Sequence, residues 1–85
     1  MGYFVYILKS VPSGKFYKGS SDNPDRRLVF HNSIEKGFTS RYRPWKLVWK
    51  KEYPSKSEAQ KVEKKIKSWK SRQMIEKLIR GEIDI

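Results

Sequence analysis

The stretch that decides the fold is Tyr3–Gly19, which reads YFVYILKSVPSGKFYKG. Residues 3–9 are β-branched and aromatic and carry no helix cap, so they predict a buried strand. Residues 12–14, Pro-Ser-Gly, have turn chemistry, and residues 15–19 predict the strand that returns beside the first. The Gly-Ser-Ser run that begins at Gly19 is expected to end this second strand. The stretch therefore predicts a β-hairpin.

A helix is predicted directly after the hairpin. Asp22 or Asn23 can cap its N-terminus, and Pro24 suits its first turn. We expect this helix to run from 24 to about 35 and to end at Gly37, because glycine readily adopts the backbone conformation that closes a helix.

The second half of the chain predicts one strand and two helices. Residues 45–50, WKLVWK, follow a basic loop and alternate large apolar with basic side chains, which predicts a strand with one solvent-exposed face. Residues 55–58, SKSE, are a capping box, and an apolar stripe at helical spacing follows it: Ala59, Val62, Ile66 and Trp69. Ser71 can cap a last helix that Gly81 closes. The predicted order is β-β-α-β-α-α, an α+β fold in a single domain spanning residues 1–85.

The charge of the chain indicates the kind of partner. Twenty Lys and Arg against nine Asp and Glu give 85 residues a formal net charge of +11. Such an excess on a small surface repels itself unless a polyanion is near. Nucleic acid is the expected partner, because each phosphate that is neutralised releases counterions. A ribosome-associated or membrane-surface role also fits the charge.

Composition excludes several classes of protein. The chain has no cysteine and one histidine, His31, which excludes disulfide scaffolds, zinc fingers, cysteine nucleophiles and multi-histidine metal sites. No apolar run approaches the roughly 18 residues of a transmembrane helix, and the N-terminus lacks a signal-peptide pattern. We therefore expect a soluble, cytoplasmic protein.

One carboxylate stands where the fold does not need it. Glu63 lies four residues after Ala59 and three before Ile66, inside the arc expected to face the sheet. It can sit at the edge of the stripe and pair with Lys67 at i+4. Alternatively, it is held inward for a divalent cation, which prefers carboxylate oxygen. Periodicity alone favours the first interpretation.

Two further pairs of residues offer chemistry. Arg27 and His31 share one face of the first predicted helix. There they place a planar guanidinium group, which can bind phosphate, beside an imidazole group, which can transfer a proton. Tyr6 and Tyr17 stand on facing strands of the hairpin and offer hydroxyl groups. Each pair also has a plain structural interpretation, as helix surface and as hairpin packing.

These residues fall in the order and spacing of a known family. The motifs are VYI at 5–7, YKG at 17–19, RRLVFHN at 26–32, TSRYRPWKLV at 39–48 and SEAQKVEKKIK at 57–67. Together they resemble the GIY-YIG nuclease superfamily, and most closely its small single-domain UPF0213-type members. The resemblance spans roughly residues 3–79.

The resemblance implies a fold, an activity and a site. The fold would be a three-stranded, mainly antiparallel sheet flanked by helices, and the activity metal-dependent hydrolysis of phosphodiester bonds. Glu63 would hold one weakly bound Mg²⁺ or Mn²⁺, which reverses the interpretation that periodicity favours. Arg27 would clamp the scissile phosphate. Tyr6 would act as general base or water-orienting hydroxyl, with help from Tyr17 and His31.

The general-base role sets a condition on Tyr6. A free tyrosine has a pKa near 10, so nearby cations and the metal would have to lower that pKa. Among the departures from the family pattern, Val5 replaces the first glycine and Ser20 stands where some members have a lysine. Lys18 stands where an aliphatic residue is usual. We expect it not to replace that lysine, because it projects to the opposite side of its strand from Tyr17.

The expected substrate is nucleic acid, with DNA favoured. Arg41, Arg43 and Lys46 join Arg27 as candidate contacts with it. Because a small chain has no evident groove-reading element, we expect low sequence specificity and a preference for branched, flapped or nicked DNA, with a protein partner as one source of specificity. Two rivals stay open: a non-catalytic basic nucleic-acid-binding module on the same fold, and an adaptor that docks an acidic protein.

Overall fold

The computed structural model describes residues 2–33 and 41–85. Within them the elements follow the predicted order: β1 (Tyr3–Ser10), β2 (Phe16–Ser21), α1 (Pro24–Ser33), β3 (Trp45–Tyr53), α3 (Lys56–Ser68) and α4 (Arg72–Ile79). The α+β prediction is confirmed. The predicted helix end at Gly37 lies outside the described residues. No helix in the described ranges has the length and apolar character needed to cross a membrane.

The three strands form one antiparallel sheet in the order β2-β1-β3. β1 is central because it is the most apolar strand, and a central strand is covered on both faces and both edges. Its residues Val5, Ile7 and Leu8 are fully buried. The predicted hairpin is the β1–β2 pair, in which Tyr6 lies opposite Gly19.

β2 is longer than the sequence predicts. The expectation that the strand ends at Gly19 is wrong, because Ser20 and Ser21 continue the ladder opposite Val5 and Phe4. Pairing with the buried central strand outweighs the weak strand preference of glycine and serine. The extra length matters, since it carries Ser20 along the sheet edge next to α3.

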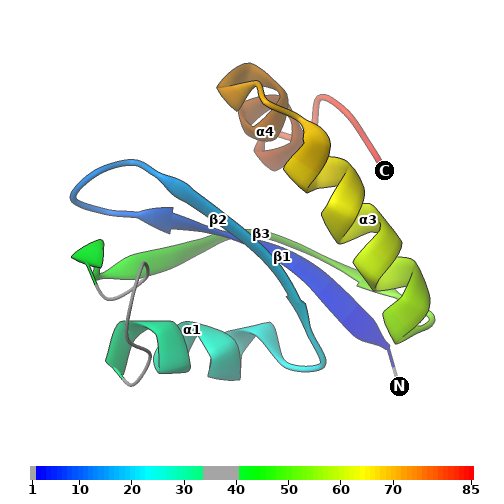
Figure 1. Cartoon of the computed structure of the whole chain (residues 1–85), viewed down its shortest axis with the longest axis horizontal. Coiled ribbons are helices and arrows are strands. Elements are labelled where there is room, and N and C mark those ends of the chain that lie inside the picture. Colours follow the sequence, from blue (N-terminus) through cyan, green and yellow to red (C-terminus); the bar gives the residue numbers. More distant parts are fainter. Residues whose placement is uncertain (1, 34–40) are drawn as a thin grey trace.

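Helices cover both faces of the sheet. In Figure 1, α1 lies on one face and α3 with α4 on the other. The α1 face holds a cluster built on Tyr6, Leu8 and Trp45. The α3–α4 face holds the main core, formed by these buried residues: Val5, Ile7, Ala59, Ile66, Ile75 and Leu78. Successive residues of β1 therefore serve different clusters, as the two-residue period of a strand requires.

A bulge in β3 overturns the predicted alternation. Residues 45–50 were expected to place all their large apolar side chains on one face, but the register shifts between Ile7, opposite Trp49, and Leu8, opposite Leu47. Trp45 and Leu47 consequently pack on the α1 face and Trp49 on the α3–α4 face. An extra residue in one strand reverses the faces of all that follow.

The predicted helix caps have different outcomes. Ser55 caps α3 as expected, with its Oγ accepting a hydrogen bond from the Glu58 backbone N–H at 3.2 Å. Ser71 occupies the N-cap of α4, but its side chain makes no capping hydrogen bond. Gly81 follows α4 with a φ of +79°, a left-handed conformation that glycine adopts without steric cost.

Candidate active site

Three of the predicted site residues form one cluster between the hairpin and α1. The Tyr6 hydroxyl lies 3.3 Å from His31 Nε2, and the rings of Tyr17 and His31 are 4.7 Å apart. Tyr6 is 1% exposed and His31 is fully buried. The sequence motifs from β1, β2 and α1 thus meet on the α1 face of the sheet.

The backbone around His31 is held by contacts from the start of β3. Arg43 Nε donates a 2.7 Å hydrogen bond to the His31 carbonyl oxygen. Asn32 forms a two-way clamp on Trp45: its Nδ2 donates to the Trp45 carbonyl, and its Oδ1 accepts from the Trp45 N–H at 2.6 Å. Sequence reasoning gave Asn32 no role, although it adjoins His31 in the motif. The clamp fixes the end of α1 against the sheet.

Gly19 makes room for the Tyr6 side chain. A Cβ at Gly19 would lie 2.7 Å from the Tyr6 hydroxyl oxygen and 2.9 Å from its Cζ, closer than ordinary contact allows. The Tyr6 ring therefore lies directly over the backbone of the edge strand at its register partner. The strand-breaking role assigned to Gly19 is replaced by this packing role.

Arg27 reaches the same cluster from the first half of α1. Its guanidinium group lies near enough to the Tyr6 hydroxyl to lower the pKa of Tyr6, and it stacks 4.7 Å from the Phe30 ring. The i and i+4 spacing places Arg27 and His31 on one face of α1, as predicted. A planar cation thus stands beside the buried hydroxyl, where it can bind a phosphate group through two N–H donors.

Glu63 joins this arrangement from the other helix layer. Its side chain is 18% exposed, with Oε1 accepting a 2.5 Å hydrogen bond from Ser20 Oγ and Oε2 2.6 Å from Lys67 Nζ. The predicted pair with Lys67 is confirmed, and Glu63 also points inward to the edge strand, while its role as a metal ligand stays a prediction. Sequence reasoning missed Ser20 as the donor. The strand period could have indicated it, since Ser20 shares a face of β2 with Lys18.

The environment of Tyr6 works against ionisation. Burial raises the pKa of Tyr6 to about 12, and electrostatic interactions with Tyr17 and Glu63 act in the same direction, while Arg27 lowers it. The condition for a Tyr6 general base, that cations lower this pKa, is not met in the free protein, because loss of hydration outweighs the effect of Arg27. Tyr6 is therefore a neutral hydroxyl at physiological pH, suited to orienting a water molecule by hydrogen bonding.

The donor set of the site fits one hard cation. Among residues 2–33 and 41–85, no three or more His, Asp or Glu side chains gather into a group that could hold a metal. Glu63 supplies a partly exposed carboxylate, and the Ser20 hydroxyl lies against it as a second oxygen. Such a pair suits Mg²⁺ or Mn²⁺ that keeps most of its water ligands. The strength of metal binding stays a prediction.

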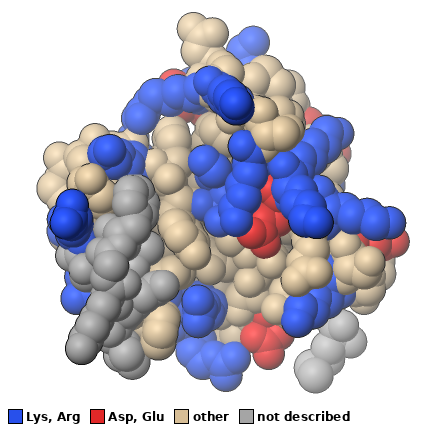
Figure 2. All heavy atoms as spheres, in the orientation of Figure 1, with Lys and Arg blue, Asp and Glu red and all other residues tan. Residues whose placement is uncertain are grey.

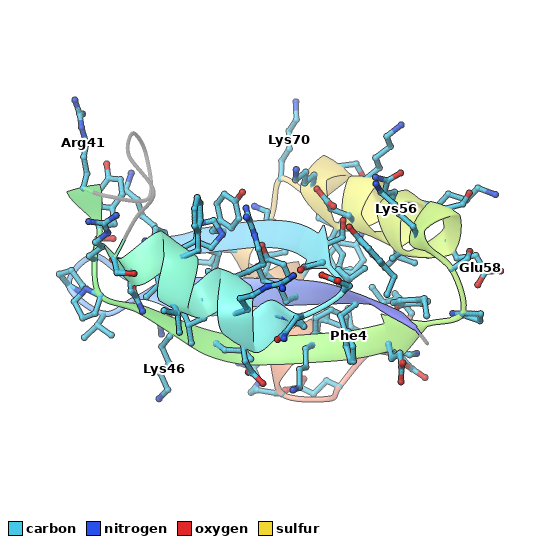
Figure 3. All side chains as sticks on the ribbon, turned by 90° about the horizontal axis from the view of Figure 1, so that it is seen from below. Phe4, Arg41, Lys46, Lys56, Glu58 and Lys70 are labelled. Atoms are coloured by element: carbon cyan, nitrogen blue, oxygen red, sulfur yellow. The ribbon has the colours of Figure 1, made fainter. Side chains whose placement is uncertain are left out.

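The remaining predicted contacts lie in different places. Arg41 is exposed, whereas Arg43 is partly buried and contacts the His31 carbonyl oxygen. Lys46 is exposed, and Figure 3 shows it pointing to the opposite side of the molecule from Arg41. The structure thus brings Arg43 to the cluster but does not bring Lys46 there. Figure 2 shows Lys and Arg side chains over much of the visible face, with small acidic groups between them.

The chain is similar to known proteins over most of its length. A family model described as the GIY-YIG catalytic domain matches residues 2–77. A UPF0213 protein from Staphylococcus epidermidis is 36% identical over 80 residues, which are 93% of this chain and 96% of that protein. The solution NMR structure of a UPF0213 protein from Bacillus halodurans superposes with a TM-score of 0.59 at 34% identity, covering 94% of this chain and 84% of that one.

Longer proteins match about half of this chain. The structure-specific endonuclease subunit SLX1 of Debaryomyces hansenii is 45% identical over 53 residues, which are 54% of this chain. The subunit of the same name from Chaetomium globosum is 48% identical over 52 residues. The chain spans about 15% of the length of these two fungal proteins.

Proposed function

The chain belongs to the GIY-YIG family, and we propose that it is a divalent-metal-dependent endonuclease that hydrolyses phosphodiester bonds in DNA with low sequence specificity. The observation that carries this proposal is the meeting of Tyr6, His31 and Arg27 on one side of Gly19 and Ser20, with Glu63 on the other. Packing alone requires neither the buried histidine nor the inward carboxylate. We take residues 1–85 as one catalytic domain.

Each side chain of the cluster has a separate role in the proposed hydrolysis. Arg27 binds the non-bridging oxygens of the scissile phosphate with its planar fork. The Tyr6 hydroxyl orients the attacking water. With His31 neutral and Nε2 unprotonated, the water proton moves to the Tyr6 oxygen as the Tyr6 proton moves to Nε2 over the 3.3 Å contact. This relay does not need an ionised tyrosine. Tyr17 supports the His31 ring by packing against it.

Glu63 is the residue proposed to hold the metal. A bound Mg²⁺ or Mn²⁺ supplies charge that neutralises the phosphate and stabilises the leaving 3′-oxygen. In the free protein, Ser20 fixes the orientation of the carboxylate and Lys67 balances its charge. Lys67 is half exposed, so it can leave the carboxylate and contact substrate phosphate instead.

The proposed substrate is DNA of irregular structure, as in repair or recombination. Two observations support this choice: the net charge of +11, and the structure-specific endonuclease subunits among the relatives. The word subunit in those names also supports a protein partner that adds specificity. Arg41 and Arg43 are proposed contacts with the DNA backbone, and Lys46 is a proposed contact on the opposite side. We propose a cytoplasmic location.

A specific contact favours a second candidate, a nucleic-acid-binding module without catalysis. Lys67 occupies one oxygen of Glu63 at 2.6 Å, which blocks that oxygen as a metal ligand while the contact persists. The basic surface would then bind phosphates without cutting them.

Labelled duplex, flap, branched and single-stranded DNA separate the two candidates. Each is incubated with the protein in Mg²⁺, in Mn²⁺ and in EDTA. We expect metal-dependent cleavage with a preference for flap or branched substrates. Binding of all four substrates that weakens with salt, without cleavage in either metal, would favour the module. Cleavage confined to one base sequence would contradict the proposed low specificity.

A further inference from the structure

A hollow lies on the α3–α4 side of β2, and the proposed mechanism does not use it. It has a volume of about 360 Å³ and lies between β2 and the junction of α3 with α4. Its lining includes two aromatic and four cationic side chains: Phe16, Trp69, Lys15, Lys18, Lys70 and Arg72. We call this hollow the β2–α4 groove. Its position confirms that Lys18 projects away from Tyr17, which packs on the α1 face.

The charge of the groove fits an anion. Among the described residues, no carboxylate lines it. Arg72 is partly committed elsewhere, since its Nε lies 3.5 Å from Glu76 Oε2 and its guanidinium stacks on Phe16 at 4.7 Å. Lys18 and Lys70 approach the groove from β2 and from the α3–α4 junction. Figure 3 shows Lys70 extending away from the ribbon at this junction. Two lysines from separate elements can thus hold a phosphate backbone between them.

Trp69 gives the groove an aromatic surface. It follows the last residue of α3 and is partly buried, with one side packed against the main core. The Phe16 ring is already covered by Arg72, so Trp69 is the ring left to contact a ligand in the groove. An aromatic side chain fixed beside cations is the arrangement on which a nucleic-acid base stacks while its phosphates are neutralised.

The groove and the proposed active site lie along the same two elements, β2 and α3. Lys18 and Ser20 project to the same face of β2, and Ser20 contacts Glu63. On the other side, α3 runs from Glu63 to its end just before Trp69. β2 and α3 therefore lead from the metal-binding carboxylate into the groove. A nucleic-acid strand that had its scissile phosphate at Glu63 and followed these two elements would bring its neighbouring nucleotides to Lys18, Lys70 and Trp69.

We propose that the β2–α4 groove binds a single-stranded segment of the substrate, next to the scissile phosphate. The role of the groove in cleavage rests on the proposed function. The test of the groove does not, because it measures binding without cleavage. A single strand fits better than a duplex, because the groove is small and offers a stacking surface. A duplex keeps its base faces inside and would use only the lysines. The groove would give the enzyme its preference for flaps and single-stranded branches.

Binding without cleavage tests the groove directly. A fluorescein-labelled oligo(dT) of about 12 nucleotides is titrated with protein in EDTA, and binding is followed by anisotropy at several salt concentrations. Lys18→Ala/Lys70→Ala is compared with the matched control Lys65→Ala/Lys77→Ala, which removes two exposed lysines outside the groove. We expect about tenfold weaker binding for the groove variant. The slope of log K against log salt should fall by about 1.4, for two lost phosphate contacts.

The control and two further measurements decide the outcome. Lys65→Ala/Lys77→Ala should change the affinity less than about twofold, and Trp69→Leu should weaken it about tenfold through lost stacking. Equal losses in the two lysine pairs would overturn the proposal, since net charge alone would explain them. An equal loss of blunt-duplex binding by the groove variant would overturn the single-strand assignment. If only the groove variants lose oligo(dT) binding, the result supports the proposal even if the wild-type protein cuts no substrate.

Discussion

Ser20 and Glu63 are 43 positions apart in the sequence, and the Ser20 hydroxyl donates a 2.5 Å hydrogen bond to Glu63 Oε1. This contact joins the edge strand of the sheet to α3 at the carboxylate that we propose as the metal ligand. It exists because β2 continues past Gly19 and because Glu63 points inward. The position at which some family members place a lysine thus holds a residue that orients the acid.

Removing the Ser20 hydroxyl should weaken the metal site. Groups that orient a metal ligand typically contribute 10- to 100-fold to metal affinity or activity. We expect Ser20→Ala to raise the Mg²⁺ concentration for half-maximal cleavage about tenfold, while Ser20→Thr, which keeps the hydroxyl, stays near wild type. Cleavage rates over a Mg²⁺ titration check this. An unchanged Mg²⁺ midpoint in Ser20→Ala would show that the hydrogen bond does not position Glu63.

Lys67 should compete with the metal for Glu63. Because its ammonium group lies 2.6 Å from Glu63 Oε2, a cation must displace it. We expect Lys67→Gln to lower the Mg²⁺ midpoint about twofold to fivefold, a modest change because the pair is partly exposed. Lys61→Gln on the same helix is the matched control. A higher midpoint in Lys67→Gln alone would contradict the competition and assign Lys67 to phosphate binding.

The Tyr6 pKa gives a prediction that needs no substrate. With its pKa raised to about 12, Tyr6 should ionise after ordinary tyrosines in a titration of phenolate absorbance, and Tyr6→Phe should lack this late step. The folded-state pKa exceeds the unfolded value near 10, so the stabilisation is complete below pH 10 and is lost as the pH rises toward 12. Relative to Tyr6→Phe, the free energy of unfolding should fall by about 2 to 3 kcal/mol over that range. A parallel pH dependence of both proteins in urea unfolding would contradict it.

The Gly19 contact predicts a clash that one further change relieves. Gly19→Ala brings a Cβ to 2.7 Å from the Tyr6 hydroxyl oxygen. We expect a loss of about 1 to 3 kcal/mol in stability, typical of overpacking, together with at least tenfold slower cleavage. Gly19→Ala/Tyr6→Phe should recover part of the stability, because the hydroxyl contact is removed while the ring carbon at 2.9 Å stays close, but it should not recover the cleavage. If Gly19→Ala unfolds in urea like wild type, the close approach of Tyr6 to β2 is wrong.

The order of the elements could be predicted because local signals decide it. The Ser55 cap, the apolar run of β1 and the stripe of α3 each depend on residues a few positions apart, and all three agree with the structure. Glu63 could be singled out for the same reason, since its place in the stripe depends on helical periodicity alone.

What the sequence did not predict depends on contacts between distant segments. The β3 bulge depends on pairing with β1, and the length of β2 depends on the same ladder. The Ser20–Glu63 bond requires β2 and α3 to lie side by side. The Tyr6 pKa also depends on burial, which local sequence does not fix, and this burial raises the pKa despite the nearby charge of Arg27.

The most direct test of the account compares two carboxylate substitutions in single-turnover cleavage of the preferred DNA substrate with Mg²⁺. Glu63→Gln removes the proposed metal ligand, whereas Glu82→Gln removes an exposed carboxylate that pairs with Arg80 outside the site. Both variants are purified identically, so a contaminating nuclease would appear equally in each. We expect at least a hundredfold slower cleavage for Glu63→Gln, with DNA binding retained, and a wild-type rate for Glu82→Gln. Equal cleavage by the two variants would contradict it.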